Sequence, residues 1–377
     1  MTRGRRWFIF MVVVVAIIGI AVLSFLTGCA SLGGEVAGDR LARVEASAQY
    51  RDGAFFNDVP QAKLSMGIYW DYIAEQFGGD QIRVPPFPIA VLPVVIENPD
   101  APPPDGLRAI WLGHASVYVE IDGTRLLVDP VFSDRPSPVE FLGPKRSHEP
   151  PISLPNLPKV DAVVISHDHY DHLDMPTIQH LSAKGSRFLV PLGIGAHLQA
   201  WGVPDTQIVE LEWWQSGKIN GLEIFATPSR HYSGRSISDY KATLWSSWSI
   251  IGPRHRLYYS GDTGYSDHFK KIGDKFGPFD LSIIKVGAYG PGASWMDSHM
   301  NPEHAVQANV DVQARRMLPV HWATFNLAFH DWDEPIQRAV QAANKANVDL
   351  AIPRIGEIVD ADRPAPKLEW WRKVQEK

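Results

Sequence analysis

The sequence predicts an α/β (α+β) domain, because apolar runs of strand length and helical stretches are mixed from Arg108 onward. The strand-like runs lie at 161–167, 186–191, 222–228, 256–262, 281–287 and 316–322. The helical stretches, 175–184 and 301–314, each have a proline near the first turn, where the missing N–H costs little. No internal repeat of motifs is visible.

Composition limits the classes of protein to consider. A chain of 377 residues suits one large domain or two of ordinary size. Apolar residues make up 45% of it and thirteen are tryptophans, which is enough for a buried core and argues against disorder. The formal net charge of −6 argues against a general nucleic-acid-binding protein. The single cysteine cannot form an intrachain disulfide.

Residues 1–29 are predicted to be a lipoprotein-type signal segment. Three arginines precede the apolar run 7–26, and "LTGC" ends at Cys29 after small residues. This ending resembles the lipobox of bacterial lipoproteins, in which the cysteine is lipidated and becomes the mature N-terminus. The alternative is an uncleaved transmembrane helix, because an apolar run of this length can span a bilayer.

Both interpretations of the N-terminal segment keep its arginines in the cytoplasm and place the rest of the chain outside. We therefore expect an extracytoplasmic, membrane-anchored protein, as a lipoprotein of a bacterial envelope would be. The proline-rich stretches in 30–107 predict an extended lead-in and linker. Residues 108–377 are predicted to be the main folded domain, and they open with a strand meander that turns at Asp122 and Gly123.

The stretch "SHDHYDHLD", residues 166–174, follows an apolar strand directly. His167 and His169 are two residues apart, so in an extended segment they point to the same side. Asp171 and His172 come where the chain turns toward a helix and can face a second centre. Such a density of imidazoles and carboxylates predicts a metal site.

Further candidates end three later strands: His231, Asp262 and His321. Taken alone, such a histidine is more often an ordinary core or surface residue, and Asp262 in "SGDTG" can be a turn residue. Their matching positions after strands make them expected ligands once the 166–174 cluster is considered. Imidazole and carboxylate suit zinc, iron or manganese.

These motifs occur in a recognisable order. "WLGHASVYVE", "SHDHYDHLD", "TPSRH", "SGDTGY", "NPEHAV" and "VHWATF" follow one another between residues 108 and 356. The series resembles the metallo-β-lactamase-fold hydrolases and, more closely, the family of N-acylphosphatidylethanolamine-hydrolysing phospholipases D. The metal motif is common to the whole fold family, whereas "SGDTGY" and the tryptophan strings are more specific.

The resemblance implies a four-layer αββα sandwich of the metallo-β-lactamase type with two divalent metal ions, zinc being the expected metal. It implies that one ion is held by His167, His169 and His231, the other by Asp171, His172 and His321, and that Asp262 bridges both. All seven positions carry the expected residue type. The N-terminal segment and the lead-in carry no specific match.

The implied reaction is hydrolysis of a phosphodiester, with N-acylphosphatidylethanolamine cleaved to N-acylethanolamine and phosphatidic acid. Two metal ions about 3.5–4 Å apart make hydroxide available near neutral pH and neutralise charge that builds on a phosphoryl oxygen. The expected partners are a phospholipid or other small phosphodiester, and the membrane through a lipid anchor, but not nucleic acid. The alternatives are a lactone-ring hydrolase of the same fold and a non-catalytic envelope lipoprotein.

Several residues are weaker candidates. His299 is, together with Asp262, a candidate catalytic residue. It would contact phosphate or assist the departing alkoxide. His114 is either a partner of a ligand or a core histidine. Lys145 and Arg146 are headgroup contacts or part of an exposed basic loop. Four tryptophans would line an acyl groove or pack in the core: Trp213, Trp214, Trp245 and Trp248.

Overall fold

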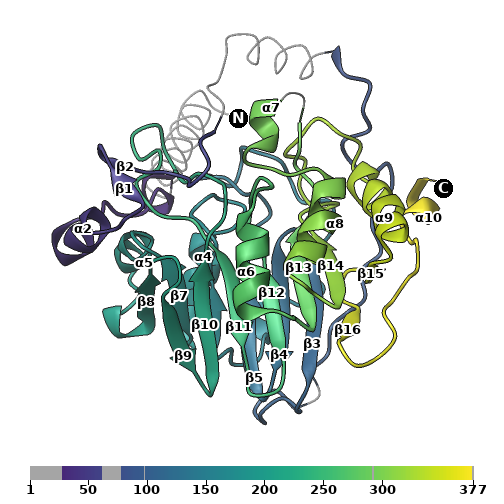
Figure 1. Ribbon diagram of the computed structural model, residues 1–377, viewed down its shortest axis with the longest axis horizontal. Coiled ribbons are helices and arrows are strands. Elements are labelled where there is room, and N and C mark those ends of the chain that lie inside the picture. Colours follow the sequence, from purple (N-terminus) through teal and green to yellow (C-terminus); the bar gives the residue numbers. More distant parts are fainter. Residues whose placement is uncertain (1–27, 62–77, 97, 291–292, 376–377) are drawn as a thin grey trace, which may run out of the picture.

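The computed structural model describes residues 28–61, 78–96, 98–290 and 293–375. Two seven-stranded sheets pack face to face, and helices cover both outer faces (Figure 1). The expected αββα sandwich is therefore confirmed. Among the described residues, none of the helices has the length and apolar character needed to cross a bilayer. The expected signal segment lies outside the described residues except for Gly28 and Cys29.

The first sheet has the strand order β16-β3-β4-β5-β6-β7-β8. Its strands are β3 (Leu107–Gly113), β4 (Ser116–Ile121), β5 (Thr124–Val128), β6 (Ala162–Val164), β7 (Arg187–Pro191), β8 (Ile208–Leu211) and β16 (Ile358–Asp360). Neighbours from β5 to β8 pair in parallel, and neighbours from β16 to β5 pair antiparallel. The predicted meander is confirmed as β3–β5.

The second sheet has the order β15-β14-β13-β12-β11-β10-β9. Its strands are β9 (Ser216–Ile219), β10 (Leu222–Thr227), β11 (Ser247–Ile251), β12 (Arg256–Tyr259), β13 (Leu281–Lys285), β14 (Arg316–Val320) and β15 (Asp349–Leu350). Pairing is antiparallel from β9 to β12 and parallel from β12 to β15. Consequently β10, β12, β13 and β14 all end at one edge of the sheet.

Helices α4 (Met175–Ala183) and α5 (Gly195–Ala200) pack on the first sheet, and α6 (His268–Phe276), α8 (Pro302–Asp311) and α9 (Glu334–Ala346) pack on the second. Short helices are η1 (Leu154–Asn156), η2 (Asp205–Gln207), α7 (Ala293–Met296) and α10 (Arg372–Gln375). The two helices predicted at 175–184 and 301–314 are confirmed as α4 and α8. Both have a proline at their first or second position.

The alternation of side chains along β3 explains how the first sheet is buried on both faces. Ala109 and Trp111 belong to the cluster between the two sheets, whereas Ile110 and Leu112 belong to the cluster beneath α4 and α5. Successive side chains of a strand point to opposite faces, so an uninterrupted apolar strand can fill two layers at once.

The lead-in 30–107 is more structured than its sequence suggests. It contains helix α2 (Gly38–Glu45) and the hairpin of β1 (Tyr50–Arg51) and β2 (Ala54–Phe55). Val44 and Phe55 pack with Trp213 and Trp245 in a third apolar cluster. The described residues of 79–106 contain no helix or strand and run along the surface of the sandwich. The division of the chain at residues 29 and 107 stays a prediction.

Candidate metal centre

The seven predicted ligands lie together at the edge where the parallel strands end. The loop after β6 carries His167, His169, Asp171 and His172, and the chain segments after β10, β12 and β14 carry His231, Asp262 and His321. Since strands of both sheets end at this edge, the site lies at the top of the sandwich in Figure 1. The sequence therefore predicted correctly that these strand ends meet.

Three histidines form the first group of donor atoms. His169 Nδ1 lies 2.9 Å from His167 Nε2 and 3.3 Å from His231 Nε2. Three nitrogen atoms around one tetrahedral zinc ion would be about 3.4 Å apart, given Zn–N distances of about 2.0–2.1 Å. The three rings are thus arranged as they would be around a single cation.

The second group contains Asp171, His172 and His321. Asp171 Oδ2 lies 3.4 Å from the Nε2 atom of each of these two histidines. Asp262 completes the group, because its two carboxylate oxygens lie 3.5 Å from His172 Nε2 and 3.2 Å from His321 Nε2. Asp262 also has a carboxylate oxygen within 4.8 Å of a ring nitrogen of His231, so it lies between the two groups.

Buried hydrogen bonds fix the ring nitrogens that are left for a metal. His231 Nδ1 donates to the carbonyl of Ser298 at 3.0 Å, and His172 Nδ1 donates to Asp129 Oδ2 at 2.6 Å. Ser166 Oγ donates to Asp129 and accepts from His167 Nδ1. In all three histidines the proton therefore sits on Nδ1 and the Nε2 lone pair faces the site, which is how outer partners orient metal-binding histidines.

The chemistry of the donor set fits divalent cations. His172 Nε2, His321 Nε2 and Asp262 Oδ1 are buried and have no hydrogen-bond partner, a costly arrangement unless a ligand satisfies them. Burial lowers the pKa of His172, but Asp262, Asp171 and Asp129 outweigh it and hold that pKa well above its usual range. The three carboxylates thus favour a positive charge at this point of the site.

The site also contains a lysine that the sequence analysis missed. Lys285, the last residue of β13, is 1% exposed, and its Nζ lies 2.6 Å from His299 Nδ1. Burial lowers the pKa of Lys285 to about 8, although Asp262 and Asp171 raise it. Burial and the neighbouring Lys285 hold the pKa of His299 well below its usual range. The ammonium group therefore donates to Nδ1 of a neutral ring, whose own proton sits on Nε2.

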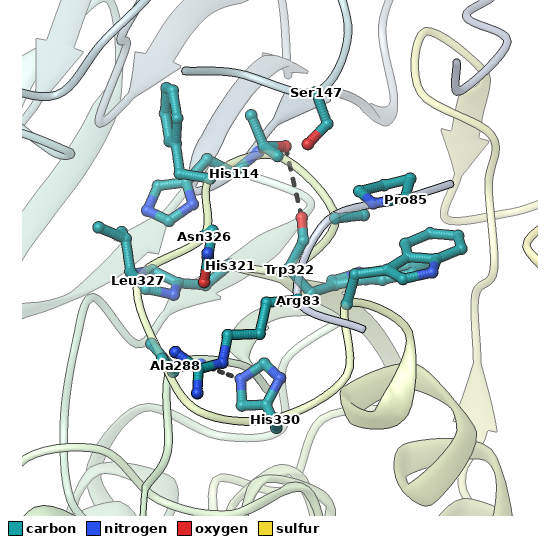
Figure 2. A pocket seen from close by; sticks show the side chains of 15 residues that line it. Arg83, Pro85, His114, Ser147, Ala288, His321, Trp322, Asn326, Leu327 and His330 are labelled. Carbon is teal, nitrogen blue, oxygen red and sulfur yellow. Dashed lines mark hydrogen bonds between the residues drawn. The ribbon is translucent and has the colours of Figure 1, made fainter. Parts of the chain in front are cut away.

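His114 and Arg83 lie beside the second group of donors. His114 Nε2 is 2.9 Å from Asp171 Oδ2, and this histidine is 1% exposed. It is therefore the partner of a predicted ligand, which is one of the two roles considered for it. A cavity of about 20 Å³ adjoins His114 and His321, and Arg83 from the lead-in lines it next to His330 (Figure 2). Arg83 brings a positive charge to this side of the site.

The remaining weak candidates do not surround the metal donors. Lys145 is exposed and pairs with Asp134, whereas Arg146 is buried and donates to the carbonyl of Val131, so only Lys145 fits an exposed basic loop. Trp213, Trp245 and Trp248 are buried and each donates its indole N–H to a backbone carbonyl, and Trp214 packs against Phe276. The tryptophans are packing residues rather than the lining of an acyl groove.

The lead-in supports the site directly, which the sequence analysis did not foresee. The side chain of Asn57 accepts from the backbone N–H of His231 at 3.0 Å and donates to its carbonyl at 2.9 Å. It also accepts from the indole of Trp245 at 2.9 Å. No local pattern marks Asn57 as functional. Asp129 and Lys285, by contrast, end strands at the same edge as the ligands, so the rule that found Asp262 would have found them.

Comparison with known proteins identifies the family. The family model for the beta-lactamase superfamily domain matches residues 124–322, more than half of the chain. The chain belongs to this superfamily. As a superfamily member it is a metal-dependent hydrolase of the metallo-β-lactamase fold, and the His and Asp groups at its sheet edge are those able to hold divalent metal ions.

Relatives within the superfamily differ in how much of the chain they match. An uncharacterized protein of Mycobacterium tuberculosis is 45% identical over 353 residues, covering 91% of this chain and 92% of its own. N-acyl-phosphatidylethanolamine-hydrolyzing phospholipase D 1 of Caenorhabditis elegans is 41% identical over 230 residues, covering 58% of this chain and 65% of its own. The resemblance to this phospholipase family stated above is thereby confirmed.

A solved structure shows the same fold. Igni18, a metallo hydrolase of Ignicoccus hospitalis, superposes with a TM-score of 0.52 at 22% identity, covering 67% of this chain and 97% of its own. At this identity the likeness shows the superfamily fold alone.

Proposed function

We propose that the chain is a phospholipase D-type phosphodiesterase with two divalent metal ions, expected to be zinc, that cleaves N-acylphosphatidylethanolamine to N-acylethanolamine and phosphatidic acid. The observation that carries the proposal is the convergence of seven donors, five of them buried, in two groups with Asp262 between them. It is supported by the phospholipase relative from Caenorhabditis elegans, whose name states this activity. A non-catalytic lipoprotein is disfavoured because no donor is missing.

The surrounding residues suit an anionic substrate. Bound metal ions would supply Lewis acidity and would lower the pKa of water at the site. His167, His169 and His231 would hold one ion, Asp171, His172 and His321 the other, and Asp262 both. Arg83 and Lys285 add two positive charges around these donors, which suits the negative charge of a phosphodiester. His299 would donate from Nε2 to a phosphoryl or leaving oxygen, and Lys285 would hold the ring for this role.

We further propose that the N-terminal segment anchors the enzyme in a membrane. Lipidation of Cys29, an exposed residue, and retention of the apolar run 7–26 as a transmembrane helix are the two routes. Both place the catalytic domain outside the cytoplasm of a bacterial envelope. Mass spectrometry of the purified N-terminal peptide distinguishes them, because only the first route removes residues 1–28 and adds lipid to Cys29.

The test of the activity uses the full chain in detergent, loaded with zinc and supplied with N-acylphosphatidylethanolamine. We expect both products by mass spectrometry and two metal ions per chain by elemental analysis. Asp262→Asn should lower the rate at least 10³-fold and reduce the metal content, because the shared carboxylate is lost. Asp267→Asn, the same change at an exposed aspartate of the loop before α6, is the matched control and should behave as wild type.

The outcomes separate the candidate reactions. Protein that carries two metal ions but leaves the phospholipid intact contradicts the phospholipase proposal and leaves the metal-dependent hydrolase standing. Acyl lactones are then the substrates to supply, since a lactone-ring hydrolase of this fold would use the same donors. Turnover that persists in Asp262→Asn contradicts the proposed role of Asp262.

A further inference from the structure

We propose that two loops beside the metal centre, 133–143 and 233–241, form a surface that enters the lipid bilayer and turns the metal centre toward it; this rests on the proposed function and its membrane anchor. We call them the bilayer-contact loops. Their exposed apolar side chains are Phe141 (63%), Leu142 (58%), Ile237 (104%) and Tyr240 (56%). Large apolar side chains left exposed on neighbouring loops indicate a partner or a membrane.

The described chain begins between these two loops. Ser31 Oγ donates to the carbonyl of Pro138 in the first loop at 2.8 Å. Arg235 in the second loop donates from Nε and Nη2 to the carbonyl of Ser31 at 3.0 and 2.8 Å. Cys29, two residues earlier, is exposed, and the apolar run 7–26 precedes it in the sequence. An anchor of either kind therefore attaches to the domain at the bilayer-contact loops, which makes the bilayer their occupant.

The same arginine joins this attachment point to the metal centre. Arg235 is 5% exposed and donates from Nη1 to the carbonyls of Asp168 and Leu173, at 2.6 and 3.0 Å. These two residues lie within and directly after the predicted ligand run 167–172. Trp201 adds a bond from its indole N–H to the carbonyl of Ala30 at 2.7 Å. Residues 30 and 31 of the lead-in are thus held against the ligand loop, so an anchor just before them fixes the orientation of the metal centre as well as its location.

Aromatic side chains connect the loop tip with the metal donors. The ring of exposed Tyr240 lies 5.8 Å from that of Tyr232. Tyr232 lies 4.7 Å from the rings of both His169 and His231. Tyrosine combines an apolar ring with a polar tip and suits the boundary between a bilayer and water. A lipid headgroup that reaches this boundary is therefore next to the first group of donors.

The charges of the bilayer-contact loops favour apolar insertion over attraction to anionic lipid. Outside the buried Arg235, they carry two positive and three negative side chains: Arg135, Lys241, Asp134, Glu140 and Asp239. Polybasic surfaces bind anionic membranes in a salt-dependent way, and these loops lack that excess of positive charge. We therefore expect insertion into zwitterionic phosphatidylcholine, with little dependence on salt.

The test places an environment-sensitive NBD fluorophore on the full chain reconstituted in phosphatidylcholine vesicles. Single cysteines replace Phe141 or Ile237, and Ile358→Cys is the control, an apolar residue 50% exposed on β16 at the opposite edge of the first sheet from β8. All variants carry Cys29→Ser, which keeps the apolar segment and leaves one reactive thiol. Lipids with a quencher on the acyl chain should quench positions 141 and 237 at least fivefold more than 358, in low and high salt.

Equal quenching at the three positions overturns the proposal. The proposal is also overturned if the fluorophores at positions 141 and 237 are shielded from water without vesicles and the protein elutes as a dimer in size-exclusion chromatography. The occupant of the surface is then a second copy of the chain. Hydrolysis separates this surface from the proposed function. Phe141→Ser with Ile237→Ser should slow turnover of substrate in vesicles about tenfold and leave turnover in detergent micelles unchanged. Quenching without hydrolysis would contradict only the phospholipase assignment, and hydrolysis without quenching only the surface.

Discussion

At the scale of single residues, the metal centre depends on where each imidazole proton sits. Carbonyl and carboxylate acceptors hold the protons of His231 and His172 on Nδ1, which leaves their Nε2 atoms for a metal. His299 has the opposite arrangement, because Lys285 occupies its Nδ1. Histidine thus serves as a metal ligand at two positions and as a hydrogen-bond donor at a third. The hydrogen-bond partner of Nδ1 determines which role each ring takes.

Lys285→Met tests the role given to the lysine, since methionine fits a buried site but has no proton to donate. We expect kcat to fall about 10²-fold on N-acylphosphatidylethanolamine, with little change in KM, because positioned proton donors contribute about 10²–10⁴-fold. An aryl phosphodiester with a good leaving group needs no proton, so its hydrolysis should fall less than threefold. Steady-state kinetics on both substrates is the measurement.

The matched control for the lysine variant is Lys271→Met, at an exposed position of α6. It should leave both substrates unaffected. Equal losses on the two substrates would show that Lys285 acts only on structure or charge and would contradict the proposed hydrogen-bonded path through His299. Metal content should stay at the wild-type value in both variants.

At the scale of secondary-structure elements, the two sheets are joined far from the metal centre by a polar contact between turns. Asp122, in the β4–β5 turn, accepts from the backbone N–H groups of Arg254 and His255 in the β11–β12 turn, at 2.9 and 3.1 Å. Its Oδ1 also lies 2.6 Å from His255 Nδ1. Burial lowers the pKa of His255, but the hydrogen bond and charge of Asp122 raise it above its usual value overall.

This contact predicts a pH dependence of stability. The pKa of His255 in the folded protein lies above the unfolded value of about 6.5. The stabilisation that protonated His255 gives to the folded state is therefore fully present below about pH 6.5 and is lost as the pH rises through the folded pKa. Asp122→Asn keeps the acceptor and tolerates the left-handed backbone at φ 46°. It should lower the free energy of unfolding by about 1 kcal/mol at pH 6, and by clearly less at pH 9. Urea unfolding of both proteins at the two pH values measures this; an identical difference at both would contradict it.

The elements that the sequence predicted share one property. Strands β6, β10, β12, β13 and β14 are short, mainly apolar runs that end at, or within two residues of, a charged or polar residue. Their buried side chains leave a pattern in the sequence. The pattern could place His231, Asp262 and His321 at one edge without any knowledge of packing. It carried no information on Asn57, Arg83 or the bonds of Arg235, because these depend on segments that meet only after the chain has folded.

At the scale of the whole molecule, the lead-in is part of the catalytic unit. Asn57 is 8% exposed and its amide pairs with both backbone polar groups of His231. Asn57→Ala should lower the free energy of unfolding by about 3 kcal/mol, because it leaves buried donors and acceptors unpaired. Urea unfolding and elemental analysis of the same preparation are the measurements, and metal content should fall because His231 loses its support.

The exposed neighbour Asp58 provides the comparison for this variant. Asp58→Ala should change the free energy of unfolding by less than about 0.5 kcal/mol, as expected for a surface substitution, and should keep the full metal content. Wild-type stability in Asn57→Ala would contradict the structural role of the lead-in.

The pairing of β16 with β3 has a consequence for biosynthesis. Ile358 and Val359 of β16 pair with Ile110 and Ala109 of β3. One side of β3, the first strand of the sandwich, is therefore paired by a strand that is synthesised near the end of the chain. Until then the backbone N–H and C=O groups along that side of β3 are open to other chains. The first sheet is therefore completed only near the end of synthesis. A stop codon between β15 and β16 should therefore yield a product that collects in the insoluble fraction rather than a shorter enzyme.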